Sequence, residues 1–146
     1  MINDDFKQLF IRDLDRLKGE CEAYSDGSKL WIKVDGINNS AGNLTMHLCG
    51  NLQHFIGAVL GESGYKRNRD FEFSGMASFE ELLSEIETTK QVIDNYFNDV
   101  DPASFSSKYP LELFGYPMTV NYFLIHLEGH LNYHLGQINY HRRILS

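Results

Sequence analysis

Three histidines near the end of the chain, His126, His130 and His134, repeat at a spacing of four residues. If this segment is helical, the spacing places all three imidazoles on one strip of the helix. A neighbouring stripe of the same segment is apolar, so the imidazoles border a packed face rather than open water. Neutral imidazole is a common ligand of transition-metal ions, and two histidines one turn apart can bind one ion. The pattern therefore indicates a metal site that still needs a ligand from another part of the chain.

A second histidine-bearing segment can supply that ligand. Between residues 41 and 60, His47, Asn51 and His54 lie beside an apolar stripe, in the same geometry as the histidines of the last segment. The alternative is that these histidines fill space or form hydrogen bonds in a core, which is the ordinary role of a single buried histidine. Three histidines in register favour the metal site, but the spacing by itself leaves both interpretations open.

The composition excludes several classes of function. The chain has 146 residues, 42% hydrophobic and 23% charged, which predicts a single domain over residues 1–146. Its net charge of −7 argues against nucleic acid as the main partner, because phosphate binding needs a basic face. It contains no apolar run of about 18 residues, so no membrane span is expected. Cys21 and Cys49 fit neither zinc-site nor redox spacing, and a cytoplasmic protein with reduced thiols is expected.

Four segments carry the apolar period of amphipathic helices: residues 2–24, 41–60, 78–98 and 119–145. They predict an all-α fold, a four-helix bundle with long loops between the helices. Among these loops, residues 30–34 are expected to form a connector or a brief strand. Residues 65–76 are expected to form a loop, which can lie over a site or simply cross the surface. Residues 105–116 are expected to be irregular or weakly extended.

Two stretches of the predicted helices carry a family resemblance. They are Asn43–Leu52, with the sequence NLTMHLCGNL, and His130–Ile138, with the sequence HLNYHLGQI. Together with the order of the helices, they resemble the DinB/YfiT-like superfamily of metal-dependent four-helix-bundle proteins. The loop segment Arg69–Phe73, RDFEF, is similar to a segment of one subgroup. The resemblance covers essentially the whole chain and implies three ligands for a divalent ion: His47, His130 and His134.

Other polar residues near these motifs are expected to support the ligands. Asn51 and Gln137 flank the proposed ligands and can hold them or a bound substrate. His54, His126 and His141 do not match ligand positions, and of these His54 and His126 are expected beside the ligands. If the loop over residues 65–76 covers the site, its two carboxylates are the candidates to orient water as a catalytic base: Asp70 and Glu72.

Three neutral imidazoles leave coordination positions open, which is typical of a catalytic zinc site. Water in such a position has a lowered pKa, and a thiol is held as thiolate. The resemblance implies a metal-dependent thiol S-transferase or hydrolase that acts on a small molecule, with Zn or Ni, or else Fe or Mn, and in the first case a low-molecular-weight thiol. A stress-related protein that binds a metal or small ligand without turnover, and a purely structural bundle, are the alternatives.

The same resemblance implies a homodimer. The aromatic content of 13% is more than a core of this size needs, which supports a contact with a second copy. The candidates for that contact are Phe71, Phe73, Tyr109, Phe114 and Tyr116.

Overall fold

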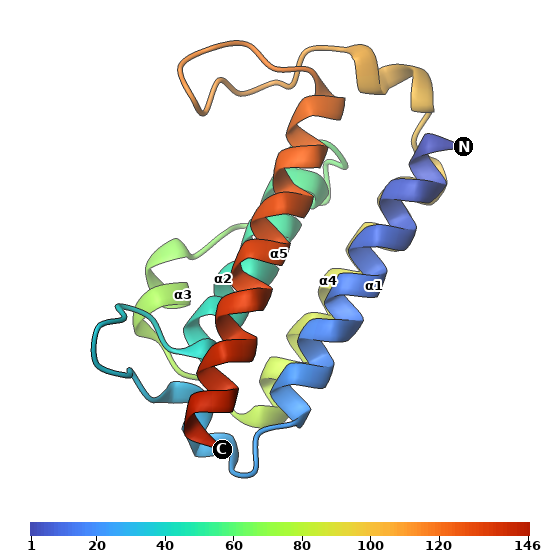
Figure 1. Cartoon of the computed structure of the whole chain (residues 1–146). Helices are drawn as coiled ribbons and strands as arrows, with labels where there is room; N and C mark the ends of the chain where they lie inside the picture. The colour runs from blue at the N-terminus through green and yellow to red at the C-terminus, as the bar shows by residue number, and fades with distance from the viewer.

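Four long helices build the protein, which a computed structural model describes over residues 1–146 (Figure 1). They are α1 (Ile2–Glu22), α2 (Ala41–Leu52), α4 (Phe79–Asp99) and α5 (Val120–Leu145). α2 runs directly into a π-helical segment, η2 (Gln53–Ala58). The predicted all-α four-helix bundle is confirmed, and none of its helices is both long and apolar enough to cross a membrane.

The helices do not simply alternate in direction. α1 and α5 run one way along the bundle, and α2 and α4 run the other way (Figure 1). Because α2 and α4 are parallel, the chain between them must return along the bundle before α4 can begin. This return segment, residues 59–78, contains the short helix α3 (Arg69–Ser74), which packs on α2. The predicted loop over residues 65–76 is therefore wrong in part, because Asn68 caps a helix there by accepting a hydrogen bond from the Phe71 N–H at 3.1 Å.

The two remaining connections contain 3₁₀ turns. η1 (Gly27–Trp31) shows that the connector was the correct alternative for residues 30–34 and that the strand was wrong. η3 (Pro102–Ser106) precedes irregular chain with one isolated antiparallel bridge between Lys108 and Thr119. Tyr109 in this segment is fully buried, and its hydroxyl donates to the Phe55 carbonyl at 2.8 Å. The prediction of Tyr109 as a dimer contact is thus wrong, because the η2 backbone occupies its polar end.

A single apolar core holds the helices together. Its 28 buried residues include Phe10, Leu14 and Leu17 of α1, which recur at helical spacing on one face. Leu127 and Leu131 of α5 belong to the same cluster. Burial of each such side chain contributes about 2 kcal/mol. The packing therefore fixes the axial register between α5 and its neighbours. It thereby also fixes the position of every α5 side chain along the bundle axis.

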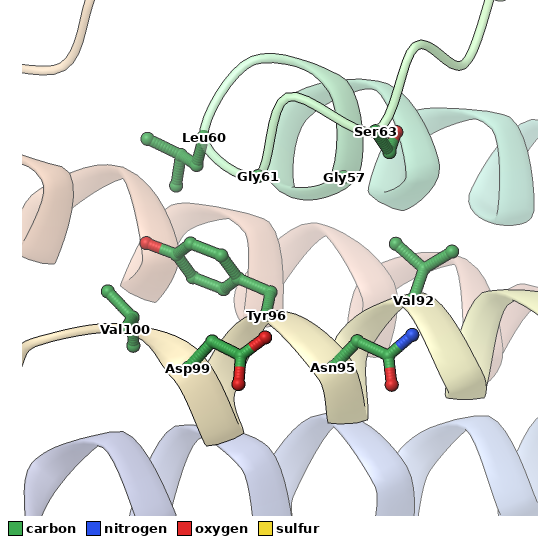
Figure 2. A pocket seen from close by; sticks show the side chains of 9 residues that line it. All are labelled: Gly57, Leu60, Gly61, Ser63, Val92, Asn95, Tyr96, Asp99 and Val100. Carbon is green, nitrogen blue, oxygen red and sulfur yellow. The ribbon is translucent and has the colours of Figure 1, made fainter.

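A cavity of about 450 Å³ lies between η2 and the second half of α4 (Figure 2). Gly57 and Gly61 approach α4 here without side chains, and Tyr96 projects between the two elements. The lining contains no histidine or cysteine and a single carboxylate, Asp99. This cavity therefore offers no set of metal ligands, and its lining has no histidine to activate the hydroxyl of Ser63.

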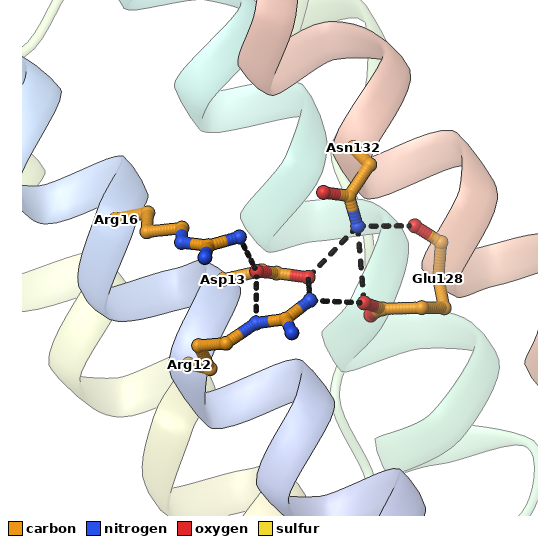
Figure 3. A network of polar contacts seen from close by, with 5 residues as sticks. All are labelled: Arg12, Asp13, Arg16, Glu128 and Asn132. Carbon is orange, nitrogen blue, oxygen red and sulfur yellow. Dashed lines mark hydrogen bonds and ion pairs between the residues drawn. The ribbon is translucent and has the colours of Figure 1, made fainter.

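A buried carboxylate ties α1 to α5 (Figure 3). Asp13 is fully buried and accepts hydrogen bonds from Arg12 Nε and Asn132 Nδ2, each at 2.8 Å. Burial by itself would raise the pKa of Asp13, but the hydrogen bonds from Arg12, Glu128 and Asn132 outweigh it and hold the pKa well below its usual range. Burial, together with Asp13, raises the pKa of Glu128 to about 8. The pair anchors the stretch of α5 next to His130.

Candidate metal centre

His47 on α2 meets His130 and His134 of α5 between the two helices. The ring centroids of His47 lie 5.1 Å from His130 and 5.3 Å from His134, and those of His130 and His134 are 4.6 Å apart. One ring nitrogen from each residue can be chosen so that all three lie within 4.8 Å of one another. The structure thus brings together the three residues that the sequence predicts as ligands.

The closest pair of these nitrogens has the spacing of two ligands on a single ion. Nitrogens bound at about 2.1 Å to one tetrahedral ion lie roughly 3.4 Å apart, and the Nε2 atoms of His47 and His130 are 3.2 Å apart. Without an ion, the same distance suits a hydrogen bond between these two rings. Such a bond does not account for the third imidazole, His134, at the same point. A divalent ion shared by all three rings does.

Two of the imidazoles have a pKa that keeps them neutral at pH 7. Burial lowers the pKa of His130 to about 3, and the neighbouring His134 and His47 lower it further. Burial also lowers the pKa of His134, against the opposing effect of its hydrogen bond with Gln137. Because only a neutral imidazole has a lone pair for a metal ion, this environment favours ligation over protonation.

His47 is held from behind by a buried ion pair. Its Nδ1 lies 3.1 Å from Oε1 of Glu72, which suits an imidazole N–H that donates to a carboxylate. Arg67 donates two hydrogen bonds to the same carboxylate, from Nε to Oε2 at 2.8 Å and from Nη2 to Oε1 at 2.9 Å. Burial by itself would raise the pKa of Glu72, but His47 and Arg67 lower it. With the N–H at Nδ1, the lone pair of His47 lies at Nε2, which faces His130.

Contacts with α2 hold the return segment where the Glu72 carboxylate can reach His47. Asn43 at the start of α2 donates to the carbonyl oxygens of Glu72 at 3.1 Å and Gly75 at 3.0 Å. The ring of Phe73 packs against the His47 ring, with the centroids 4.8 Å apart. Gly50 leaves the space on α2 that the Glu72 carboxylate occupies. α3 therefore acts as a support for one ligand rather than as a loop over the site.

His134 is oriented by its own helix. Its Nδ1 lies 2.7 Å from Oε1 of Gln137, three residues further along α5, and this hydrogen bond leaves Nε2 free. Gln137 therefore has the supporting position that the sequence predicts. His130 differs from both other ligands, because its Nδ1 is buried without a hydrogen-bond partner.

The other predicted site residues take different places. Asn51 is buried, but its Oδ1 has no hydrogen-bond partner, so it does not hold a ligand. His126 stacks on the His130 ring at 6.4 Å. His54 packs edge-on against Phe55 and has no hydrogen bond or ring contact with the three histidines. Asp70 is exposed on α3 and its carboxylate forms no hydrogen bond. His141 is a core residue whose ring nitrogens bond Tyr24 and the Ile32 carbonyl.

A cavity of about 310 Å³ opens onto His47 and His130. Asn51 and the two arginines of the return segment, Arg67 and Arg69, supply its polar lining. The rest of its wall is aromatic or aliphatic, formed by Phe55, Leu113, Phe114, Phe123, His126 and Leu127. A small molecule with an anionic group and an apolar body would find both kinds of contact beside the imidazoles.

Two residues of the site are not evident from sequence patterns. Arg67 precedes Glu72 by five residues with a helix cap between them, a spacing that belongs to no recurrent motif. Gly50 offers a weak signal, because a glycine inside a helical pattern often marks the close approach of another group. Only the fold shows that this group is the Glu72 carboxylate.

Comparison with known proteins adds a family to this geometry. The sequence profile described as the DinB superfamily matches residues 9–138. This range contains α2, α3 and α4 entirely and most of α1 and α5, including all three histidines. Among curated proteins, none matches the chain.

Proposed function

Because the chain belongs to the DinB superfamily, we propose that it binds a divalent ion through His47, His130 and His134. With this ion bound, the protein acts as a thiol S-transferase. The observation that carries the proposal is the convergence of the three imidazoles, with ligand nitrogens within 4.8 Å of one another. Two of the three have hydrogen-bonded Nδ1 atoms, which is the usual arrangement behind metal-binding histidines. Zn or Ni suits a set of three imidazoles, and Fe or Mn can take the place of Zn or Ni.

Three protein ligands leave a position for a nucleophile. A bound divalent ion lowers the pKa of a thiol or a water molecule placed there. Hydrolysis also needs a group within reach that moves the remaining proton of the bound hydroxide to the leaving group. Glu72, the nearest carboxylate, is engaged by Arg67 and His47, and Asp70 is exposed on α3. A bound thiolate has no remaining proton to move, and this difference favours thiol transfer over hydrolysis.

The cavity beside the histidines supports the same choice of substrate. Arg69 stacks over Phe73 at 5.2 Å, and the Arg67 guanidinium lies 5.7 Å from the centre of the Phe55 ring. Because Arg67 is already paired with Glu72, it is the charge of Arg69 that suits a low-molecular-weight thiol with a carboxylate. The unpartnered amide of Asn51 offers a donor and an acceptor to the bound molecule. The aromatic wall suits the apolar body of an electrophile.

Metal analysis of protein purified without a histidine tag tests the first part of the proposal. We expect about one ion per chain, with a steep loss of affinity in His47→Ala, His130→Ala and His134→Ala. His54→Ala is the matched control, since His54 lies on the same helix as His47 without touching the ligands. A chelator should lower the melting temperature of the parent but not of the three ligand variants, because only the parent is stabilised by the ion. Equal behaviour of all four variants would contradict the site.

Turnover assays test the second part. The metal-loaded protein should join a carboxylated thiol to an electrophile, and the rate should fall in the three ligand variants. Activity on esters or amides without added thiol would instead support a hydrolase. Stoichiometric metal with no turnover in either screen would support the alternative of a non-catalytic protein that binds a metal or small ligand.

A further inference from the structure

The cavity beside the imidazoles has four aromatic residues in its wall: Phe55, Phe114, Phe123 and His126. Three of them belong to the bundle itself, Phe55 to η2 and the other two to α5. The Phe123 ring is 1% exposed and lies edge-on to Phe55, with the centroids 5.3 Å apart, so both rings help to form the core. Phe114 comes from the connection between η3 and α5, residues 107–119. This connection therefore supplies the one aromatic side chain of the wall that is not on a helix.

The connection is fixed to the bundle at its base. The Tyr109 N–H donates to the Met118 carbonyl at 2.7 Å, and both side chains are buried in the core. Between these two residues the tip of the connection turns at Gly115, whose φ of +80° is one that other residues rarely adopt. In Figure 1 the tip is the orange loop next to the start of α5. The buried base thus determines where the tip lies.

The tip carries apolar side chains back to the cavity. Leu113 and Phe114 line it and are 43% and 42% exposed. The Phe114 ring stands edge-on to the His126 ring, with the centroids 4.8 Å apart, and His126 stacks on His130 at 6.4 Å. Because a half-exposed ring still has apolar surface to remove from water, a ligand that packs against it gains binding energy. Phe114 is thus placed to contact a molecule bound beside the imidazoles.

Aromatic walls favour an aromatic ligand over an aliphatic one of similar size. The face of a phenylalanine ring is negative and its edge is positive, so a further ring gains about 0.5–1.5 kcal/mol beyond the burial of its area. An electron-poor ring is the best complement to these negative faces, and an arene that reacts with a thiolate must be electron-poor. The cavity volume of about 310 Å³ is at the small end for ligand sites, which suits a single ring.

We propose that this cavity binds an electron-poor aromatic electrophile and that Phe114 selects it over aliphatic electrophiles. The inference rests on the proposed thiol transfer, for which it names the second substrate. In that reaction the thiol has released its proton to the buffer. The thiolate sulfur then forms a bond to a ring carbon, and the bond from this carbon to the leaving group breaks. With a haloarene, halide departs with the electron pair of the broken bond, so no further proton moves.

Turnover of two electrophiles of different shape tests the selection. The metal-loaded full chain is assayed with mercaptopropionate as the thiol and with either chlorodinitrobenzene or iodoacetamide as the electrophile. Phe114→Ala should raise KM for the chloroarene by about 5- to 10-fold, the loss of one ring contact, and leave turnover of iodoacetamide unchanged. Phe114→Leu should fall between parent and Phe114→Ala, because it keeps apolar area but loses the ring. Leu111→Ala is the matched control, since Leu111 is 37% exposed on the same tip and does not line the cavity.

Binding of an unreactive analogue separates this inference from the proposed function. Dinitrobenzene has no leaving group, so its binding requires neither a thiol nor turnover. Added to the full chain, with zinc and again with a chelator, its ring current should shift the methyl NMR signals of Leu113 and Leu127, which line the cavity. The methyl signals of Leu111 should stay in place. The affinity for dinitrobenzene should fall by about 5- to 10-fold in Phe114→Ala and remain unchanged in Leu111→Ala.

The possible outcomes distinguish the two proposals. Dinitrobenzene binding that depends on Phe114, without turnover of either electrophile, would support the aromatic site and contradict the transferase. Turnover of iodoacetamide, with dinitrobenzene shifting no methyl signal of the cavity, would overturn the aromatic site and leave the transferase intact. Equal losses with both electrophiles in Phe114→Ala would overturn the selection. Circular dichroism with a parent-like melting temperature establishes that each variant is folded, and Phe114→Leu carries the comparison if Phe114→Ala is not.

Discussion

Gly50 provides a way to disturb the centre without changing any ligand. A Cβ at position 50 would stand 2.6 Å from Cδ of Glu72, closer than such atoms pack, with a carboxylate oxygen nearer still. The carboxylate cannot swing into solvent, because Glu72 is 4% exposed and Arg67 holds both of its oxygens. Gly50→Ala should therefore push Glu72 away from His47 while all three imidazoles remain present.

Two opposing effects determine the stability of this variant. Alanine is favoured over glycine inside a helix by about 1 kcal/mol. Forcing a methyl group into a filled buried site costs about 1–3 kcal/mol, and weakening the buried charged hydrogen bonds of Glu72 adds about 1–3 kcal/mol. The free energy of unfolding should thus fall by about 1–5 kcal/mol overall. Metal affinity should fall by about 10- to 100-fold, the usual effect of losing the group behind a metal-binding histidine.

Gly19→Ala is the matched control for this change. Gly19 lies within α1, and no atom stands within 4 Å of the position its Cβ would take. It should gain the helical preference alone, about 0.5–1 kcal/mol, with unchanged metal affinity. Urea unfolding in the presence of a chelator measures the stabilities, and competition titration with a zinc indicator measures the affinities. A Gly50→Ala variant that matches Gly19→Ala in both would refute the role of Glu72 behind His47.

Three further outcomes follow from contacts elsewhere. Gln137→Ala should lower zinc affinity by about 10-fold, because it frees the His134 ring, and the same indicator titration measures this. His141→Ala should lower the free energy of unfolding by about 1–3 kcal/mol, through loss of its buried partners Tyr24 and Ile32, with zinc affinity unchanged. With the pKa of Glu128 raised to about 8 from an unfolded value near 4.5, stability should fall as pH rises between these values, by up to about 5 kcal/mol. Urea titrations should show that Glu128→Gln removes this fall.

The elements of the bundle follow from the sequence because each long helix repeats its apolar stripe over several turns. Thr119 and Ser78 accept hydrogen bonds from the N–H groups of Tyr122 and Glu81, so the starts of α5 and α4 were also readable as caps. α3 was missed because six residues are too few to display a helical period. Its cap, Asn68, looks like any polar loop residue until the chain is folded.

Which histidines meet at the proposed metal site depends on their axial positions along the helices. His126 and His134 each lie one turn from His130, so spacing alone does not decide which of them completes the site. The core packing sets His47 level with His130 and His134, and it leaves His126 on the cavity wall. His54 lies two turns beyond His47, about 10 Å along the helix, which is too far for it to support the ligands. The family motif names the pair that the structure places beside His47, because it contains this register implicitly.

The three histidines proposed as ligands therefore depend on different levels of the structure. His134 is oriented within α5 by Gln137, so local helical geometry suffices for it. His47 is oriented by Glu72 and Arg67, which reach it only because the parallel α2 and α4 force the chain to return across α2. His130 has no partner at Nδ1, and it is held by its partial burial and by contacts with the rings of His47 and His126. The return segment thus supports His47 as well as joining two helices. For this reason a site whose sequence motifs lie on two helices also needs a third segment, although that segment carries no recognisable motif.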